Sequence, residues 1–389
     1  MSKPPKGPIW PAREHTLAKI AILDAYLNAW FAILGRTVKS DMLYIDGFSG
    51  PGVYAGGQDG SPIVAVKAAH KARCDAGEKW TAKTIRMVFV ERNSERFDIL
   101  QSRLAIHQRQ PNLSIQCIND AFASAFGEIR RQHMDAFTSS MPLFAFLDPF
   151  GVKGTTFSIL REILSSGTSE VFLLFDADGM ERIRVAGGAA GCEAVFDAVF
   201  GGPSWREISF TDDIKSNSRK ILVAYREQLR GRAGAKFSFS FEMRKDNGAS
   251  SYHLLFATKH IRGLEKMKEA MRAVDKNFIF ADGQTGQKIM FGPDNSAVAA
   301  VDAETYFDKF CSGKTIGYDD IRSWVLQETP YMRPDTLLTE MSHRHGVDSV
   351  IIGGKAIALG SKPVRWSETE KITFRDRLAP RKKGLFDQE

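Results

Sequence analysis

An acid and two closely spaced glycines follow a short apolar run, and their spacing is typical of a loop that binds a nucleotide cofactor. The stretch reads LYIDGFSGPG. Leu43 to Ile45 predict a buried parallel strand. Gly50 and Gly52 allow the backbone to turn sharply and to approach a ligand that a Cβ atom would keep away. We expect Asp46 at the carboxyl end of the strand, the edge where open α/β sheets bind ligands.

Two cofactors compete for this loop, because Gly50, Gly52 and Ala55 also fit the GxGxxA pattern of a dinucleotide-binding fold. A pyrophosphate group is poorly placed beside a carboxylate. S-adenosylmethionine (SAM), in contrast, carries an α-ammonium group that Asp46 could hold, directly or through water. The acid therefore favours the methyl donor, and we place Phe48, from the same loop, in the cofactor site as well. A glycine turn without a ligand remains the alternative.

Two further strand ends carry polar residues suited to a nucleoside. Met87 to Glu91 is an apolar run that ends in an acid, and a carboxylate there can accept both ribose hydroxyls. Glu91 follows Asp46 by 45 residues rather than the roughly 20 of a compact unit, so an insertion must lie between them. Asp120 follows a third predicted strand, Ser114 to Ile118. We expect it either to read the edge of an adenine or to cap the next helix.

The fourth predicted strand, Leu143 to Leu147, runs into Asp148, Pro149 and Phe150, where we expect the chemistry. A carboxylate and a backbone carbonyl can accept hydrogen bonds from an exocyclic amine and aim its lone pair at a methyl carbon. An aromatic ring can stack on an extruded base. The alternative is that Asp148 and Pro149 only end a strand and begin a helix.

These motifs need a doubly wound α/β sheet to bring their loops together. A fifth strand is predicted at Glu170 to Phe175, and Ser61 and Pro62 predict a helix start with Ser61 as the N-cap. Two later strands, Lys236 to Met243 and Ser251 to Ala257, predict an antiparallel end to the sheet. Between them and the fifth strand, Arg182 to Gly202 is rich in Gly and Ala and indicates a mobile insertion.

The order of YIDGFSGPG, GSPIVAV, VFVE, FLDPFG and YHLLFATKH resembles the three-Cys-motif partner proteins. These are similar to class I SAM-dependent methyltransferases. The resemblance implies a Rossmann-like sheet and cofactor roles, by position, for Asp46, Gly50, Gly52 and Glu91. It also implies a neighbouring protein with three cysteines as a possible partner. It does not establish a substrate.

The LDPFG piece also resembles the catalytic loop of transfer-RNA guanine-N2 methyltransferases and, less closely, the DPPY loop of adenine-N6 enzymes. We therefore expect a SAM-dependent methyltransferase that acts on an exocyclic amine of a base in RNA or DNA. The alternative is a SAM-binding or regulatory partner protein without turnover. The family usually shows a Lys-His pair near the N-terminus, whereas Lys19 is followed by Ile20 and His15 lies out of register, so no role passes to His15.

Four parts are expected along the chain. They are an N-terminal helical segment packed on the core (1–40), a Rossmann-like SAM-binding domain (41–300), a small winged-helix-like domain (301–362) and a basic tail (363–389). In the third part, helices at Ala303 to Cys311, Tyr318 to Glu328 and Arg333 to His345 precede a hairpin at Val350 to Leu359. That order is typical of a winged helix, which docks nucleic acid or protein. The basic tail carries Trp366 and Phe374, which suits phosphates and bases or a solvated tail.

Composition limits the remaining possibilities. The 389 residues contain 53 Lys+Arg and 46 Asp+Glu, a surplus of seven that fits a nucleic-acid partner without requiring one. Four scattered cysteines argue against a zinc site or a disulfide scaffold, and we expect no metal. Asp176 and Asp178 predict a helix cap, with a metal pair as the alternative. The apolar helix Leu17 to Leu34 is interrupted by polar residues, so we expect no membrane span and a cytoplasmic protein; the number of subunits is left open.

Overall fold

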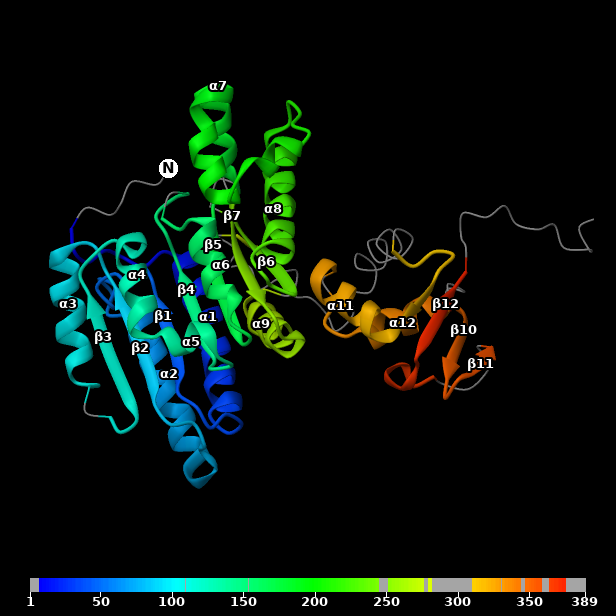
Figure 1. Ribbon diagram of the computed structural model, residues 1–389, viewed down its shortest axis with the longest axis horizontal. Coiled ribbons are helices and arrows are strands. Elements are labelled where there is room, and N and C mark those ends of the chain that lie inside the picture. Colours follow the sequence, from blue (N-terminus) through cyan, green and yellow to red (C-terminus); the bar gives the residue numbers. More distant parts are fainter. Residues whose placement is uncertain are drawn as a thin grey trace, which may run out of the picture. The chain divides into compact units, whose positions relative to one another are not determined.

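The computed structural model forms two compact units, residues 1–286 and 287–389. It describes residues 7–108, 110–152, 154–244, 251–275, 279–281, 310–329, 331–343, 347–358 and 364–375 (Figure 1). The first unit carries the predicted cofactor and acceptor loops. The second contains the region predicted to be a winged helix.

The first unit is built on an eight-stranded sheet in the order β3-β2-β1-β4-β5-β7-β6-β8. Five neighbouring strands, β3 to β5 in that order, are parallel, whereas β7 runs antiparallel to both β5 and β6. β8 pairs parallel to β6 and was not predicted. The strands are β1 (Met42–Asp46), β2 (Ile85–Val90), β3 (Leu113–Ile118), β4 (Leu143–Leu147), β5 (Ser169–Phe175), β6 (Phe237–Arg244), β7 (Ser251–Thr258) and β8 (Ile279–Ala281). The Rossmann-like sheet with an antiparallel end is therefore confirmed.

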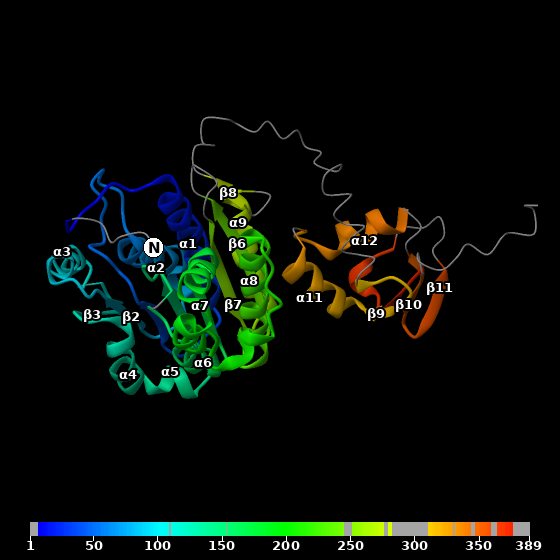
Figure 2. The same cartoon turned by 90° about the horizontal axis from the view of Figure 1, so that it is seen from above.

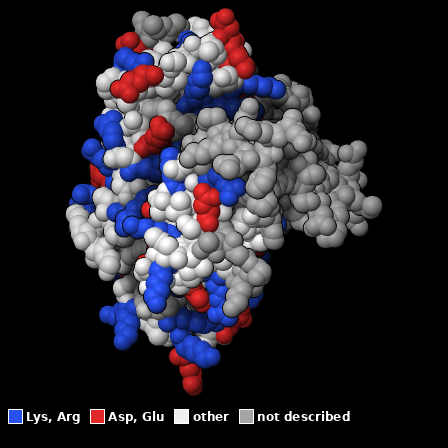
Figure 3. Space-filling model, turned by 90° about the vertical axis from the view of Figure 1, so that its right-hand side faces the viewer, with Lys and Arg blue, Asp and Glu red and all other residues white. Residues whose placement is uncertain are grey.

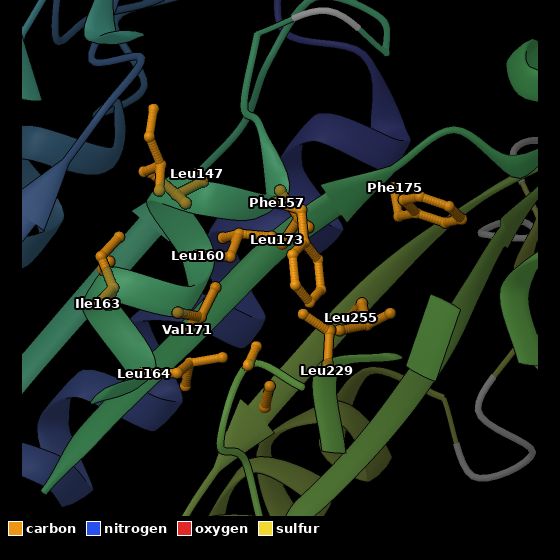
Figure 4. Close-up of a cluster of buried hydrophobic side chains, with 14 of the residues drawn as sticks. Leu147, Phe157, Leu160, Ile163, Leu164, Val171, Leu173, Phe175, Leu229 and Leu255 are labelled. Carbon is orange, nitrogen blue, oxygen red and sulfur yellow. The ribbon is translucent and has the colours of Figure 1, made fainter. Parts of the chain in front are cut away.

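Helices cover both faces of this sheet (Figure 2). One face packs against α4, α5, α6, α7 and α8. Figure 4 shows part of that core, where side chains such as Leu147 and Leu173 from the strands meet Leu160 and Ile163 from α6. The helices are α1 (Glu14–Leu34), α2 (Ser61–Ala76), α3 (Ser94–Ala105), α4 (Phe122–Gln132), α5 (Met134–Thr138), α6 (Phe157–Ser165), α7 (Ala177–Phe200), α8 (Ile214–Gly231) and α9 (Ile261–Val274). Burial of apolar strand and helix residues at about 25 cal/mol per Å² is the main stabilising term of such a sandwich.

α1 packs on the opposite face, beside α2 and α9. It is long and apolar enough to cross a membrane by composition alone, but Ile22, Leu23, Leu27 and Phe31 are wholly buried in this unit. Tyr26 lies against Phe144 of the sheet at 5.4 Å between ring centroids. Burial of this kind is what a core helix shows, as the sequence predicted.

The segment predicted as a mobile insertion is instead helical. Residues Arg182 to Phe200 belong to α7, and Gly201, in the left-handed conformation (φ 70°), ends the helix. Asp176 caps the other end by accepting a hydrogen bond from the Gly179 amide at 2.7 Å, so the capping interpretation of Asp176 is confirmed. α7 and α8 rise past the edge at which the parallel strands end (Figure 1).

The second unit contains a four-stranded sheet in the order β11-β10-β12-β9. Its elements are β9 (Thr315–Gly317), α11 (Tyr318–Glu328), α12 (Pro334–His343), β10 (Val347–Ile352), β11 (Lys355–Ala358), the short η4 (Trp366–Glu368) and β12 (Lys371–Phe374). Two predicted helices and the hairpin, which turns at Gly353 and Gly354, are thus present. The other predicted helix, Ala303 to Cys311, lies outside the described residues except at its last two positions, so the winged helix stays a prediction.

Residues 364–375 are not a tail. β12 pairs with both β10 and β9, and Trp366, Ile372 and Phe374 are buried in the core of the second unit. The Trp366 indole also donates a hydrogen bond to Thr339 Oγ1 at 3.0 Å. Lys371, the one basic residue between Trp366 and Phe374, is the first residue of β12. Residues 376–389, the rest of the predicted tail, lie outside the described residues.

Candidate functional site

The loop after β1 has the tight glycine turn that the sequence predicted. Gly50 (φ 62°) and Gly52 (φ 73°) both adopt left-handed conformations, which are strained for other residues. The Gly60 amide donates to the Gly52 carbonyl at 2.9 Å, and a Cβ added to Gly60 would lie only 2.9 Å from the Gly52 carbonyl carbon. The loop thus closes on itself before α2 begins.

Asp46 lies at the end of β1 and is wholly buried. Its Oδ1 accepts a hydrogen bond from the Phe48 amide at 3.2 Å, but no described residue donates to Oδ2 with normal geometry. Burial raises the pKa of this carboxyl group from 3.8 to about 7; the Ser61 hydroxyl and the Phe48 amide partly oppose that rise, and Asp148 adds to it. A cation brought to Oδ2 would stabilise the ionised form.

Ser61 is the first residue of α2 rather than its N-cap, which is Gly60. The prediction that Ser61 caps this helix is therefore wrong. The Ser61 hydroxyl lies near the Asp46 carboxyl group instead. The residue remains part of the site by lowering the pKa of Asp46.

Glu91 lies directly after β2 and is buried. Its carboxylate accepts hydrogen bonds from the amides of Gly50, at 2.9 Å, and Asn93, at 2.7 Å, so it fixes the glycine loop against the end of the second strand. Glu91 is not among the residues that line the pocket described below. Each carboxylate oxygen retains a further lone pair, and its role toward a ribose stays a prediction.

Asp120 follows β3 at the same edge of the sheet. Its Oδ1 accepts from the Ala121 amide at 2.6 Å, but the N-cap of α4 is Ala121 itself. The capping interpretation of Asp120 is therefore wrong, and a role at an adenine stays a prediction. The neighbouring Asn119 donates to the Glu91 carbonyl at 2.9 Å and so joins the ends of β3 and β2.

Asp148, Pro149 and Phe150 form the loop after β4. β1 and β4 are adjacent and parallel, and Asp46 is in register with Phe146, so the two loops meet at one edge of the sheet as expected. Phe150 is 56% exposed, unusual for a large apolar side chain and suited to a stacking partner. A Cβ on Gly154 would lie 2.4 Å from Pro149 Cβ and 2.9 Å from Phe48, so the chain folds tightly over the glycine loop.

A pocket opens between these two loops and the N-terminal segment. It encloses about 580 Å³ of space, part of it open to solvent. The predicted residues Phe48, Gly50, Gly52, Asp148 and Phe150 line it, whereas Pro149 lines a smaller neighbouring cavity. The remaining lining residues are Trp10, Thr16, Lys19, Ile20, Ser49, Pro51, Val53, Tyr54, Gly60 and Ser61.

The wall formed by the N-terminal segment and α1 was not predicted. Trp10 accepts a hydrogen bond from the Ala55 amide through its backbone carbonyl at 2.9 Å, and its ring packs edge-on against Tyr54. Lys19 of α1 forms an ion pair with Asp148. The signal in the sequence was a lysine within an apolar stretch of helix, between Ala18 and Ile20, both of which are buried. Such a cation needs a buried partner.

No family model and no curated protein matches the chain in sequence. Among solved structures, an O-methyltransferase from Streptomyces achromogenes in complex with SAM shares 13% identity over 64% of this chain and 92% of that chain, with a TM-score of 0.30. An O-methyltransferase from Bacillus cereus in complex with SAH shares 11% identity over 61% and 80%, with a TM-score of 0.31. Likenesses at this level carry no argument about activity, which must come from the site.

Proposed function

We propose that this chain is a SAM-dependent methyltransferase that modifies an exocyclic amine of a base in RNA or DNA. The observation that carries the proposal is the wholly buried carboxyl group of Asp46, whose Oδ2 has no donor with normal hydrogen-bond geometry among the described residues, although the Ser61 hydroxyl lies close to the group. A buried polar atom without a partner is costly unless a ligand supplies one. The α-ammonium group of SAM is such a partner.

The loop geometry argues against the dinucleotide alternative. In that fingerprint the glycines open directly into a helix, whose N-terminus binds the pyrophosphate. Here α2 begins only at Ser61, after a turn closed by pairing between Val53 and Asp59. Ala55, the third position of the fingerprint, bonds to Trp10 in that turn rather than packing a helix against a strand. A pyrophosphate would also lie near the carboxyl groups of Asp46 and Asp148.

The role proposed for each residue follows from its position in the pocket or beside it. SAM supplies an electrophilic methyl group when bound. Asp46 would hold its ammonium group, Gly50 and Gly52 would allow close approach, and Phe48 would contact it in the pocket. Asp148 would accept a hydrogen bond from the acceptor amine, while the exposed ring of Phe150 would stack on the base.

Nucleic acid as the acceptor is argued from this loop rather than from charge. Figure 3 shows Lys and Arg scattered among acidic and uncharged residues on one face. An exposed aromatic beside a carboxylate suits a planar base with an amino group better than an aliphatic hydroxyl. The proposal includes a three-cysteine partner protein, so activity assays should be made with and without it.

Calorimetric titration of the full chain with SAM, and separately with NADH, tests the donor assignment. We expect micromolar SAM affinity, about −8 kcal/mol, that Asp46→Ala abolishes, and no binding of NADH. Binding of NADH instead would refute the donor assignment. Formation of S-adenosylhomocysteine from SAM with cellular RNA or DNA then tests turnover. Donor binding without product would favour the regulatory partner protein.

A further inference from the structure

Lys19 brings an ammonium group into the pocket from an otherwise apolar part of α1. The residue is only 6% exposed, and its ammonium group forms an ion pair with Asp148, whose side chain is 25% exposed. An ammonium group has three N–H donors. Within the described part of the chain, Asp148 is the partner found for it, so donors remain for a further acceptor.

The charges around the pocket indicate what that acceptor would be. Among the described residues that line the pocket, Lys19 is the only Lys, Arg or His, and Asp148 is the only acid. Asp46 is buried nearby. Its charge and that of Asp148 both raise the pKa of Tyr54, a residue of the pocket wall. The methionine end of SAM carries both an α-ammonium and an α-carboxylate group. If Asp46 holds the first, the second requires a cation, and the pocket wall offers one.

We propose that Lys19 binds the α-carboxylate group of the donor while it remains paired with Asp148. This inference rests on the donor assignment of the preceding subsection. One ammonium group, already paired with Asp148 in the absence of a ligand, would then bridge the donor's amino-acid end and the acceptor loop. The pocket would thereby select for a zwitterionic ligand, because Asp46 would bind its ammonium group and Lys19 its carboxylate group.

Calorimetry of the full chain with two donors tests this role. SAM and decarboxylated SAM share the adenosine, the sulfonium and the amine, and differ in the carboxylate. We expect Lys19→Met to weaken SAM binding roughly tenfold to a hundredfold, as for a hydrogen bond to a charged group. Its affinity for decarboxylated SAM should change less than about twofold. Lys71→Met, which removes a lysine paired with Asp75 on the surface of α2, should leave both affinities unchanged.

A double variant separates direct from indirect effects, because Lys19→Met alone leaves Asp148 unpaired and able to repel a carboxylate. Lys19→Met with Asp148→Asn removes both charges of the pair, and it also serves if the single variant fails to fold. If Lys19 contacts the donor, the double variant still binds SAM weakly. Recovery of wild-type SAM affinity in the double variant would overturn the proposal.

Two other outcomes are equally clear. Equal losses for SAM and decarboxylated SAM in Lys19→Met would mean that the substitution damages the pocket as a whole, which also overturns the inference. Failure of the wild-type chain to bind either donor would instead remove the donor assignment itself, and this inference with it. The two failures are therefore distinguished by the wild-type titration.

Discussion

Replacement of Asp46 by Asn should stabilise the first unit in a pH-dependent way. The carboxyl group is wholly buried, and its pKa is raised from 3.8 to about 7, chiefly by burial. An unfolded chain ionises this group near pH 3.8, whereas the folded protein keeps it protonated until about pH 7. Below pH 3.8 both states are protonated. Between pH 3.8 and about pH 7 the folded protein binds this proton and the unfolded chain does not, so the free energy of unfolding falls as pH rises. Above about pH 7 the loss is constant.

The size of the effect follows from the two pKa values. Each pH unit between them corresponds to about 1.4 kcal/mol, which gives up to about 4 kcal/mol at pH 8 and almost nothing at pH 4. Asn has the same shape and no charge to ionise, so Asp46→Asn should recover most of this free energy. For a unit of this size, that corresponds to an increase in melting temperature of about 10 °C at pH 8.

Scanning calorimetry of the full chain at several pH values between 4 and 8 measures the effect, because it can resolve separate transitions for the two units. Asp98→Asn, the same change at an exposed acid of α3, is the matched control and should show no comparable trend. A stability difference between Asp46→Asn and the wild type that stays constant from pH 4 to pH 8 would refute the assignment of a neutral buried carboxyl group.

The other predictions concern the pocket and the second unit. SAM affinity should weaken by roughly tenfold for each pH unit below 7, because the donor's ammonium group needs the ionised form of Asp46; titrations from pH 5.5 to 7 measure this. Asp148→Ala should abolish methyl transfer but leave donor binding largely intact. Calorimetry measures the binding, and a transfer assay on the same preparation measures the turnover. Gly60→Ala should lower the melting temperature of the first unit and weaken donor binding, since its Cβ would press on the Gly52 backbone. An unchanged melting temperature would contradict the close contact between Gly60 and Gly52. Trp366→Ala should cost the second unit about 3–5 kcal/mol as a buried aromatic, whereas a tail residue would cost nothing, and calorimetry decides between them.

Most strands could be predicted from the sequence because continuous apolar runs of five or six residues are typical of strands buried on both faces. β4 was predicted with its observed bounds, β3 and β5 begin one residue earlier than predicted, and β1 and β2 differ by one or two residues at both ends. The acids at the carboxyl ends of β1, β2 and β4 were recognised for the same reason, since a charged residue at the end of such a run marks the ligand-binding edge of an open sheet.

Capping and terminal segments were harder to predict. Ser61 and Asp120 have residue types that often cap helices, yet Gly60 and Ala121 occupy the N-cap positions. The backbone conformation at each helix start decides which residue caps it, and residue type reports that only as a preference. Trp366 and Phe374 looked like residues of a basic tail because their spacing in sequence shows nothing of β10 and β9, to which β12 pairs.

By itself, the sequence determined most strands of the first unit and the chemistry of individual loops. The glycines of the first loop, the acids at strand ends and the aromatic after Pro149 are local features that depend on spacing along the chain. Tertiary structure alone decided that Lys19 pairs with Asp148, 129 residues away, and that Trp10 forms a wall of the same pocket. It also decided that Asp46 is buried deeply enough for its pKa to rise to about 7. The reason is physical: ion pairing and desolvation depend on distances and burial that arise only when α1 packs on the sheet.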